Sequence, residues 1–404
     1  MVKGIGADAA CEILYKLPTS PGTELVPLSG ALNRVLAGDV CAEIPVPPFD
    51  RSPFDGYAFR GEDTYGADAQ NPAILKVAEE IPAGVFPKIE ITAGFASKIL
   101  TGAPIPAGAN ATIKYEKTEF SETEVRLFEQ INPNTDIVRA GSDIMRGDVI
   151  ALSGALVTEP VVSSFANQGM SHVRVYKKPA ITVISTGTEL CEVGTPLRPA
   201  AIYNSNVYTI AAYLENAGVD AINGGSVPDD PAVIAAQIKD ALATSDMVIT
   251  TGGASVGDYD FALASATALG ADVLFWKIAL KPGGAIMAAQ TGGKVILALS
   301  GNPAAAVIGL MRIAMPYIKK LCGRRDCFFP EIRVRLKDAF NKESDKTRIL
   351  RGRLEIIDGM AYFAESTGQG SEKISSLIGC DLLAELPIGA KALPRETIVR
   401  AYKI

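Results

Sequence analysis

The spacing of hydrophobic positions divides this chain into regions of different secondary structure. Between residues 60 and 147, apolar residues form short runs separated by proline and glycine, and no long helical period occurs. From residue 179 to about residue 321, strand-like apolar runs alternate with segments of helical spacing. After about residue 328, short strand-like runs return. The pattern therefore predicts a central α/β region between two β-rich regions.

The central region shows the regular alternation that is typical of a doubly wound sheet. We expect strands at 180–186, 221–223, 247–250, 272–275 and 294–299, and helices at 204–216, 231–243, 260–269 and 302–321. Pro231 and Pro303 stand in the first turns of their helices, where proline is favoured. Because strands that alternate with helices form mostly parallel sheets, the prediction is an open sheet covered by helices on both faces.

The flanking regions hold shorter predicted elements. We expect helices at 8–17, 29–37 and 159–168, and strands at 173–176, 332–336, 361–364 and 397–402. Residues 44–59 carry four prolines and predict an extended, stiff passage.

Composition excludes several classes of function. A chain of 404 residues is too long for one ordinary core, so we expect several domains. The net charge of −6 argues against broad nucleic-acid binding, which needs a basic face. The only histidine is His172, so a zinc site or a catalytic triad built on histidine is not expected.

Cysteine spacing and hydropathy indicate the compartment. None of the six cysteines forms a CxxC pair, which favours unpaired thiols in a reducing compartment. Asp8 and Glu12 interrupt the N-terminal apolar residues, so no signal-peptide core is predicted. The longest apolar region, 304–318, is too short to span a bilayer. We therefore expect a cytoplasmic protein with no membrane partner.

The segment TTGGASVGDYD, residues 250–260, is the most informative one for chemistry. Its glycines allow a close approach of the backbone to a ligand and can turn N–H groups toward an anion. Its two aspartates offer the oxygen ligands that a divalent cation prefers. The residues concerned are Gly252, Gly253, Gly257, Asp258 and Asp260. A phosphate-bearing substrate handled with a metal ion is one interpretation, and a tight turn without a ligand is the other.

Other charged residues follow neighbouring strands of the same predicted sheet. They are Glu189, Asp229, Asp230, Lys277 and Lys281, and the segment SGNPA at 300–304 follows the last strand. Because ligands bind at the carboxyl ends of strands in open α/β sheets, we expect these residues to gather at one edge. Two simpler interpretations stay open: one or both aspartates cap the helix at Pro231, and the lysines are solvated surface charges.

Two stiff loops of the β-rich region hold further candidates. Asp55 lies among aromatic residues and prolines in FDRSPFDGYAF, and Thr101 opens TGAPIPAGAN. Asp55-Gly56 can equally supply a well-packed bend without a catalytic role. The segment RAGSD adds Arg139 and Asp143.

These motifs, in this order, resemble the MoeA family of molybdopterin molybdenumtransferases, to which the E domain of gephyrin is related. The matching blocks are PPFDRSPFDGYA, TGAPIPAGANA, AGSDI, STGTEL, IYNSN, PDDP, TTGGASVGDYD, FWKIALKPGG, SGNPAAA and STGQGS, between about residues 44 and 376. The resemblance implies that the protein takes adenylated molybdopterin and molybdate, uses Mg²⁺, and releases AMP and molybdenum cofactor.

The resemblance also implies roles for individual residues. The expected catalytic residues are Asp55, Thr101, Asp143, Glu189, Lys277 and Lys281. The expected substrate-binding residues are Gly252, Gly253, Ser255, Gly257, Ser300, Gly301, Asn302, Pro303, Arg139 and Ser371. The expected metal ligands are Asp229, Asp260 and Glu189.

The family architecture implies four domains in each subunit of a homodimer. They are a linking domain at 1–45 and 148–178, a β-rich arm at 46–147, a MogA-like α/β domain that binds molybdopterin at 179–326, and a C-terminal β-barrel-like domain at 327–404. Each active-site cleft would lie between the α/β domain of one subunit and the arm of the other. A molybdopterin adenylyltransferase and recipient molybdoenzymes are further expected partners.

Three departures from the family pattern leave alternatives open. Ser300 stands where a proline is frequent, Pro53-Phe54 replaces a small residue and methionine, and the basic run before Gly141 is reduced to Val138-Arg139-Ala140. The third removes positive charge, so a changed oxyanion preference, such as tungstate, stays open. The alternative functions are molybdopterin adenylyltransferase, and a paralogue that binds molybdopterin or acts as a scaffold without catalysis.

Overall fold

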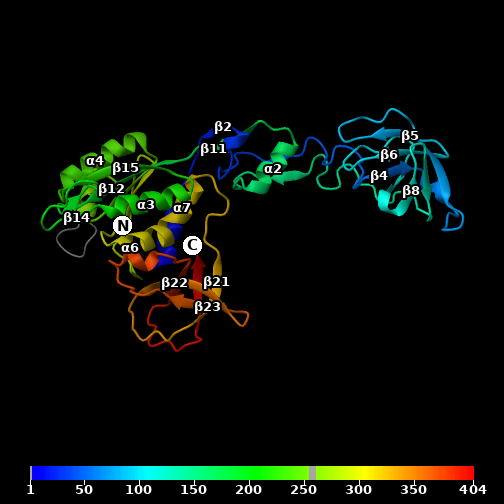
Figure 1. The fold of residues 1–404 in the computed structure, drawn as a ribbon. Coiled ribbons are helices and arrows are strands. Elements are labelled where there is room, and N and C mark those ends of the chain that lie inside the picture. The colour runs from blue at the N-terminus through cyan, green and yellow to red at the C-terminus, as the bar shows by residue number, and fades with distance from the viewer. Residues whose placement is uncertain (1, 254–260) are drawn as a thin grey trace. The chain divides into compact units, whose positions relative to one another are not determined.

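The computed structural model describes residues 2–253 and 261–404, drawn in colour in Figure 1. The chain forms two compact units. The first unit holds the chain up to Gly38 together with Ser153–Thr158 and His172–Ile404, and the second holds Asp39–Leu152 and Glu159–Ser171. No helix of the described residues is both long and apolar enough to cross a membrane.

A seven-stranded sheet forms the centre of the first unit among the described residues. Its strand order is β1-β17-β19-β20-β16-β12-β15. The strands are β1 (Val2–Ile5), β12 (Ala180–Thr186), β15 (Asp220–Val227), β16 (Met247–Thr251), β17 (Asp272–Ile278), β19 (Met287–Thr291) and β20 (Lys294–Leu299). Only β19 runs antiparallel to its neighbours. The expected mostly parallel sheet is thereby confirmed.

Helices cover both faces of this sheet, as Figure 1 shows for α3, α6 and α7 on one side and α4 on the other. They are α1 (Ala7–Tyr15), α3 (Ser205–Asn216), α4 (Pro231–Thr244), α5 (Phe261–Ala268), α6 (Pro303–Gly309), the π-helix η4 (Leu310–Ala314) and α7 (Met315–Leu321). Alternate strand residues enter different cores: Ile249 packs with α3 and α6, whereas Val248 packs with α4 and α5. Side chains that alternate along buried strands therefore require two helical layers.

The C-terminal part of the first unit is a closed sheet. Strands β22, β23, β21, β25 and β24 pair in that order, and β24 pairs back with β22. The strands are β21 (Glu331–Leu336), β22 (Thr347–Ile357), β23 (Met360–Glu365), β24 (Leu382–Leu386) and β25 (Ile398–Lys403). The short strand β18 (Leu280–Lys281) adds to β22 and so connects the α/β region with this barrel.

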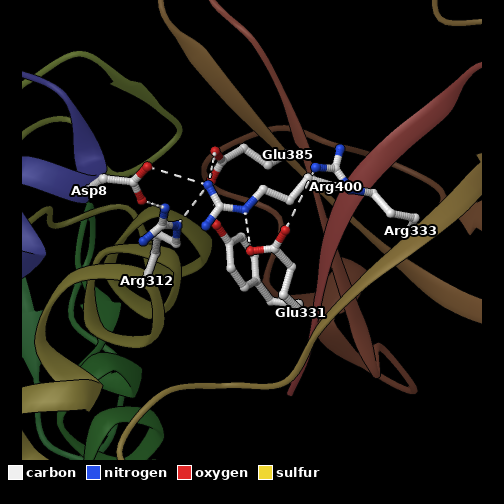
Figure 2. Close-up of polar contacts among 7 residues, drawn as sticks. Asp8, Arg312, Glu331, Arg333, Glu385 and Arg400 are labelled. Atoms are coloured by element: carbon white, nitrogen blue, oxygen red, sulfur yellow. Dashed lines mark hydrogen bonds and ion pairs between the residues drawn. The ribbon is translucent and has the colours of Figure 1, made fainter.

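An ionic network joins helices of the α/β region to the barrel (Figure 2). Arg312 of η4 pairs with Asp8 of α1 and, at 3.0 Å, with Glu385 of β24. Arg400 of β25 pairs with the same two carboxylates and, at 2.8 Å, with Glu331. The side chain of Arg312 is only 8% exposed, so this charge is held mainly by its partners.

The second unit is β-rich, as its short apolar runs predict. Its six-stranded sheet has the order β7-β4-β6-β5-β9-β8. The strands are β4 (Gly56–Phe59), β5 (Ala73–Ile81), β6 (Phe95–Ile99), β7 (Ala111–Lys114), β8 (Thr118–Phe120) and β9 (Glu124–Leu127). Tyr57 and Phe59 of β4 are buried in its core.

Smaller elements complete the two units. In the second unit they are β3 (Val40–Cys41), β10 (Val149–Ala151), α2 (Glu159–Asn167) and the 3₁₀ turns η2 (Gly61–Thr64) and η3 (Tyr115–Lys117). In the first they are β2 (Thr23–Pro27), β11 (His172–Tyr176), β13 (Leu190–Cys191), β14 (Ile202–Tyr203) and the 3₁₀ turns η1 (Leu28–Gly30) and η5 (Ile374–Leu377). All six cysteines are free thiols, as their spacing predicts.

The predicted helix at 29–37 is wrong. Only the turn η1 forms there, and Asn33 adopts a positive φ of 61°, which a continuing helix does not allow. The N–H groups of Asn33 and Leu36 donate to the carbonyls of Val157 and Ala155. Pairing with a distant segment therefore replaces local helical bonds. Strands β1 and β19 were not predicted, because neither shows a clear apolar alternation.

Candidate functional site

A cavity of about 560 Å³ lies at the carboxyl ends of three central strands, and we call it the glycine-loop pocket. Thr186, Thr251 and Ser300 line it at the ends of β12, β16 and β20. Its other described lining residues are Ser185, Glu189, Leu190, Ile202, Tyr203, Asn204, Ser205, Asn206, Asp229, Gly252, Gly253, Gly301, Asn302, Pro303 and Glu372. The expected gathering of loops at one edge of the sheet is therefore present.

Glycine is required where the loop after β16 passes β12. Gly252 has a φ of +99°, and a Cβ placed there would stand 2.3 Å from the Thr186 carbonyl oxygen. Its N–H donates to Leu299 O at 3.2 Å. A Cβ on Gly301 would meet Gly252 Cα at 3.4 Å. The absence of side chains thus lets the β16 and β20 loops meet at the pocket wall.

Hydroxyl and amide groups fix the floor of the glycine-loop pocket. Ser185 Oγ donates to Asn204 Oδ1 at 2.6 Å and lies 3.1 Å from Thr251 Oγ1. Asn206 Nδ2 donates to Gly301 O at 2.8 Å. Thr186 Oγ1 is buried and has no hydrogen-bond partner among the described residues. A buried hydroxyl beside a cavity is available to an oxygen-rich ligand.

The two aspartates before α4 have different roles. Asp230 Oδ1 accepts from Ala232 N at 2.8 Å and from Val233 N at 3.3 Å, so it is the N-cap of α4. Asp229 is half-buried and lines the pocket with the exposed Glu189. Capping was thus the right interpretation for Asp230 alone.

The potential metal ligands that line the glycine-loop pocket are mainly oxygen atoms. Glu189 and Asp229 offer carboxylates, and Thr186 offers its unpartnered hydroxyl. No group of three metal-binding side chains occurs within residues 2–253 and 261–404. Ser255, Gly257, Asp258 and Asp260 lie outside the described residues. The donors present fit Mg²⁺, which takes only one or two protein carboxylates and otherwise keeps water and substrate oxygens.

A second cavity of about 720 Å³ adjoins the first, and we call it the lysine pocket. Both pockets are lined by Ser300, Asn302 and Glu372. Four cationic side chains border the lysine pocket against two carboxylates: Lys277, Lys281, Lys346 and Arg348, with Asp345 and Glu372. The two pockets therefore differ in charge, since the glycine-loop pocket is bordered by carboxylates and by no described cation.

Lys277 is held in an unusual position. Its φ of 55° is rare for a residue with a side chain, and its Nζ lies 4.0 Å from the centre of the Trp276 ring. Lys3 Nζ approaches the same ring at 4.5 Å. Trp276 is half-buried. Lys277 thus has a stacking partner and does not project freely into solvent.

The loop that carries Ser371 closes the lysine pocket from the barrel side. Asn302 Nδ2 donates to Ser371 Oγ at 3.1 Å, and Ala305 N donates to Ser371 O at 3.2 Å. Gln369 exchanges hydrogen bonds with the backbone N and O of Arg351, whose Nη2 donates to Gly370 O at 3.2 Å. The fully buried Arg351 thus positions this loop.

Asp55 and Thr101 meet in the second unit. Asp55 Oδ1 accepts from both the N–H and the Oγ1 of Thr101 at 2.7 Å. Hydrogen bonds from the Thr101 N–H and then from its hydroxyl hold the pKa of Asp55 below its ordinary value. The carboxylate is exposed, so a fixed anion faces solvent at this position.

Arg139 is paired within the second unit. It contacts Asp50 and the Asn134 side chain, and Ala140 N donates to Asp50 Oδ1 at 2.8 Å. Partial burial raises the pKa of Asp50, but the Ala140 N–H and the Arg139 guanidinium outweigh it, and the pKa falls. Asp143 is exposed, and its N–H donates to Val46 O at 3.0 Å.

Comparison with known proteins agrees with this geometry. The model of the MoeA N-terminal region, domains I and II, matches residues 5–169. A probable molybdopterin binding domain matches 182–320, and the MoeA C-terminal region, domain IV, matches 333–403. A molybdopterin molybdenumtransferase of Staphylococcus epidermidis is 33% identical over 372 residues, which are 92% of this chain and 89% of that protein. The chain belongs to the MoeA family.

Further relatives support the whole length of the match. A molybdopterin molybdenumtransferase of Staphylococcus aureus is 33% identical and covers 95% of this chain and 91% of its own. The crystal structure of the molybdopterin biosynthesis MoeA protein from Pyrococcus horikoshii OT3 has a TM-score of 0.84 and 28% identity. It covers 99% of this chain and 100% of that one. The MoeA fold therefore includes both flanking β regions.

Sequence reasoning missed several residues of these pockets. Asn204 and Asn206 lie in the quoted block IYNSN but received no role, although their amides were a visible signal. Lys346 and Arg348 belong to a segment with no recognised motif, so only the pairing of β18 with β22 brings them to the lysine pocket.

Proposed function

We propose that this MoeA-family protein is a molybdopterin molybdenumtransferase. It takes adenylated molybdopterin and molybdate, cleaves the adenylate, leaves molybdenum on the dithiolene and releases AMP. The observation that supports this most strongly is the pair of adjoining pockets of different charge, which share Ser300 and Asn302. Adenylated molybdopterin and a separate molybdate ion need two adjoining binding regions of this kind.

The chain's own residues account for binding and electrostatic stabilisation. Gly252 and Gly253, which have no side chains, leave space for the pyrophosphate at the pocket wall. Lys277 and Lys281 face the charge that develops as the phosphoanhydride is cleaved. Ser371, fixed by Asn302, orients a polar group of the substrate between the two pockets. No histidine is required, because carboxylates and hydroxyls border the reacting region.

Glu189, Asp229 and Asp260 would hold Mg²⁺. When bound, the ion neutralises phosphate charge and so makes the phosphorus accessible to an oxygen nucleophile. Molybdate is the expected substrate oxyanion, with tungstate as the rival that the reduced basic run near Arg139 leaves open.

The second unit supplies the remaining residues in this proposal. Asp55, Thr101, Arg139 and Asp143 of a second copy of the chain would complete each active site, in a homodimer. The support for these roles comes from contacts within the second unit. Thr101 holds the Asp55 carboxylate in a fixed, charged state, which suits a residue that meets a cationic or proton-bearing group.

The two neighbouring aspartates provide a matched test. Asp229→Asn removes a carboxylate from the glycine-loop pocket, whereas Asp230→Asn preserves a good N-cap. We expect AMP release from adenylated molybdopterin to fall about 100-fold in the first variant. The second variant should stay within about twofold of the wild type.

Both variants should keep the wild-type circular dichroism spectrum and melting temperature. Equal loss of AMP release in both, or full activity of Asp229→Asn across a magnesium titration, would contradict the assignment. ATP consumption with free molybdopterin would instead indicate an adenylyltransferase.

A further inference from the structure

Glu189 stands near the start of an exposed segment of the chain, residues 187–203, which connects β12 with α3. The short strands β13 and β14, two residues each, pair at the base of this segment. Ile202 N donates to Glu189 O at 3.0 Å at the same base, and residues 193–200 are exposed to solvent. A segment with few buried contacts opens easily, so the position of Glu189 depends on individual hydrogen bonds.

Arg198, in the exposed part of this segment, contacts the residues on both sides of Glu189. Its Nη2 donates to Leu190 O at 2.9 Å and to Thr188 O at 3.4 Å. Its Nε donates to the sulfur of the buried Cys191 at 3.2 Å. A planar guanidinium presents several N–H donors in fixed directions, so one side chain can hold three acceptors together. The carbonyls before and after Glu189 are therefore fixed by the same group.

These contacts connect Arg198 with the wall of the glycine-loop pocket. Asn204, which lines that pocket, donates its N–H to Cys191 O at 2.8 Å. A Cβ placed on Gly187 would stand 2.7 Å from Glu189 Oε2, so the carboxylate lies against the backbone of its own loop. Arg198 itself lines neither the glycine-loop pocket nor the lysine pocket. Any effect of Arg198 on the site therefore passes through the backbone around Glu189.

We propose that Arg198 is a positioning residue, which keeps the Glu189 carboxylate at the glycine-loop pocket by holding the two flanking carbonyls. The inference rests on the proposed function, in which Glu189 helps to hold Mg²⁺. Charge and positioning have effects of opposite sign. A cation near a metal site repels the metal, so loss of the charge alone would strengthen metal binding. Loss of positioning should weaken metal binding, because the carboxylate would then have to be ordered when the metal binds.

The test compares Arg198→Gln with Thr195→Val. Thr195 Oγ1 donates to Glu192 O at 2.7 Å, so the control removes a hydrogen bond of the same segment without touching the carbonyls beside Glu189. Titration of the full-length protein with Mn²⁺, followed by electron paramagnetic resonance, measures metal binding without turnover. Hydrogen exchange of peptides covering residues 187–204, followed by mass spectrometry, measures the order of the segment. The Mg²⁺ dependence of AMP release adds a kinetic measurement.

We expect Arg198→Gln to weaken Mn²⁺ binding about fivefold and to speed hydrogen exchange in residues 187–204. The Mg²⁺ concentration for half-maximal AMP release should rise by a similar factor, while the rate at saturating Mg²⁺ stays within about twofold. Arg198→Lys keeps the charge but lacks the planar set of donors, so it should recover only part of the binding. Thr195→Val should bind Mn²⁺ as the wild type does.

A double variant shows whether Arg198 acts through Glu189. Glu189→Gln removes the carboxylate, so adding Arg198→Gln to it should change Mn²⁺ binding by less than about twofold. Unchanged or tighter Mn²⁺ binding in Arg198→Gln would overturn the inference. So would an undiminished effect of Arg198→Gln beside Glu189→Gln, or a wild type that binds no Mn²⁺.

Failure of the inference and failure of the proposed function give different results. If the wild type releases AMP and Arg198→Gln leaves both metal binding and hydrogen exchange unchanged, only the inference is lost. If the wild type releases no AMP, but its Mn²⁺ binding depends on both Arg198 and Glu189, the inference stands and the proposed function is lost.

Discussion

Single residues in this protein take their roles from the partners that the fold gives them. Asp229 and Asp230 are chemically alike in the sequence, yet one caps a helix and the other borders a cavity. The sequence left two interpretations of Asp55 open, a turn residue and a catalytic residue. In the structure, Asp55 accepts hydrogen bonds from the N–H and the hydroxyl of Thr101, and these favour its charged form. Hydrogen bonds and cavity walls therefore distinguish Asp229 from Asp230, whereas a catalytic role for Asp55 stays a prediction.

Thr101→Val tests the electrostatic state of Asp55. The variant removes the hydroxyl donor but keeps the backbone N–H, which is the larger cause of the lowered pKa. We expect the pKa of Asp55 to rise part of the way toward its ordinary value. Carboxyl NMR of ¹³C-aspartate-labelled protein, with Asp55→Asn for assignment, measures the change.

The stability consequence has a defined sign. A carboxyl whose pKa is lowered by folding stabilises the protein above its ordinary pKa, and this contribution is lost as the pH falls through the lower, folded-state value. Thr101→Val should therefore show a smaller loss of stability in that acidic window than the wild type. An unchanged or lower pKa for Asp55 would contradict the assignment of its donors.

At the scale of elements, strand ends decide which loops meet. The close passage of the β16 loop past β12 leaves no room for a Cβ on Gly252. Other glycines of this fold, such as Gly270, share the positive φ but have open space around them. Glycine is therefore favoured for two separate reasons, a positive φ and the lack of space for a Cβ.

Gly252→Ala and Gly270→Ala separate these two demands. Both variants place alanine at a positive φ, which costs about 1–2 kcal/mol. Only Gly252→Ala also forces a Cβ against the Thr186 carbonyl, so we expect an additional loss of at least about 1 kcal/mol and of substrate affinity. Denaturant unfolding and a substrate titration provide the measurements; equal losses in the two variants would refute the close-approach argument.

The alternation of strands and helices after residue 179 was largely predictable, because β20 and the first part of β16 are short apolar runs, whereas β19 shows no such run. Residues 29–37 were mispredicted because their helical spacing competes with pairing to residues 155–157, which no local pattern reveals. The acidic and glycine-rich wall of the site was visible in motifs. Its cationic barrel wall was not, since Arg348 reaches it only through strand register.

At the scale of the whole molecule, the barrel and the α/β region build one site together. Lys277 and Lys281 approach the lysine pocket from one side, and Lys346 and Arg348 from the other. The ionic network of Asp8, Arg312, Glu385, Arg400 and Glu331 joins the same two regions (Figure 2). Stability of that network and geometry of the pocket should therefore be coupled.

Arg312→Leu tests the structural role of the network. Removal of the arginine leaves the 13% exposed Glu385 with one cation fewer, so we expect a loss of about 3 kcal/mol in the free energy of unfolding. Glu129→Gln, which breaks the exposed pair with Lys117, should cost less than about 1 kcal/mol. Thermal and denaturant unfolding give both values, and a loss in Arg312→Leu no larger than that in Glu129→Gln would exclude a structural role for the network.

The central claim is that this protein transfers molybdenum to an adenylated pterin. The most direct measurement follows AMP and protein-bound molybdenum cofactor together, for the wild-type protein with adenylated molybdopterin and with Mg²⁺ or molybdate omitted in turn. The account predicts one AMP for each cofactor formed, and loss of the cofactor when either ion is absent. A folded wild type that binds the adenylated pterin but forms neither product with both ions present would contradict it.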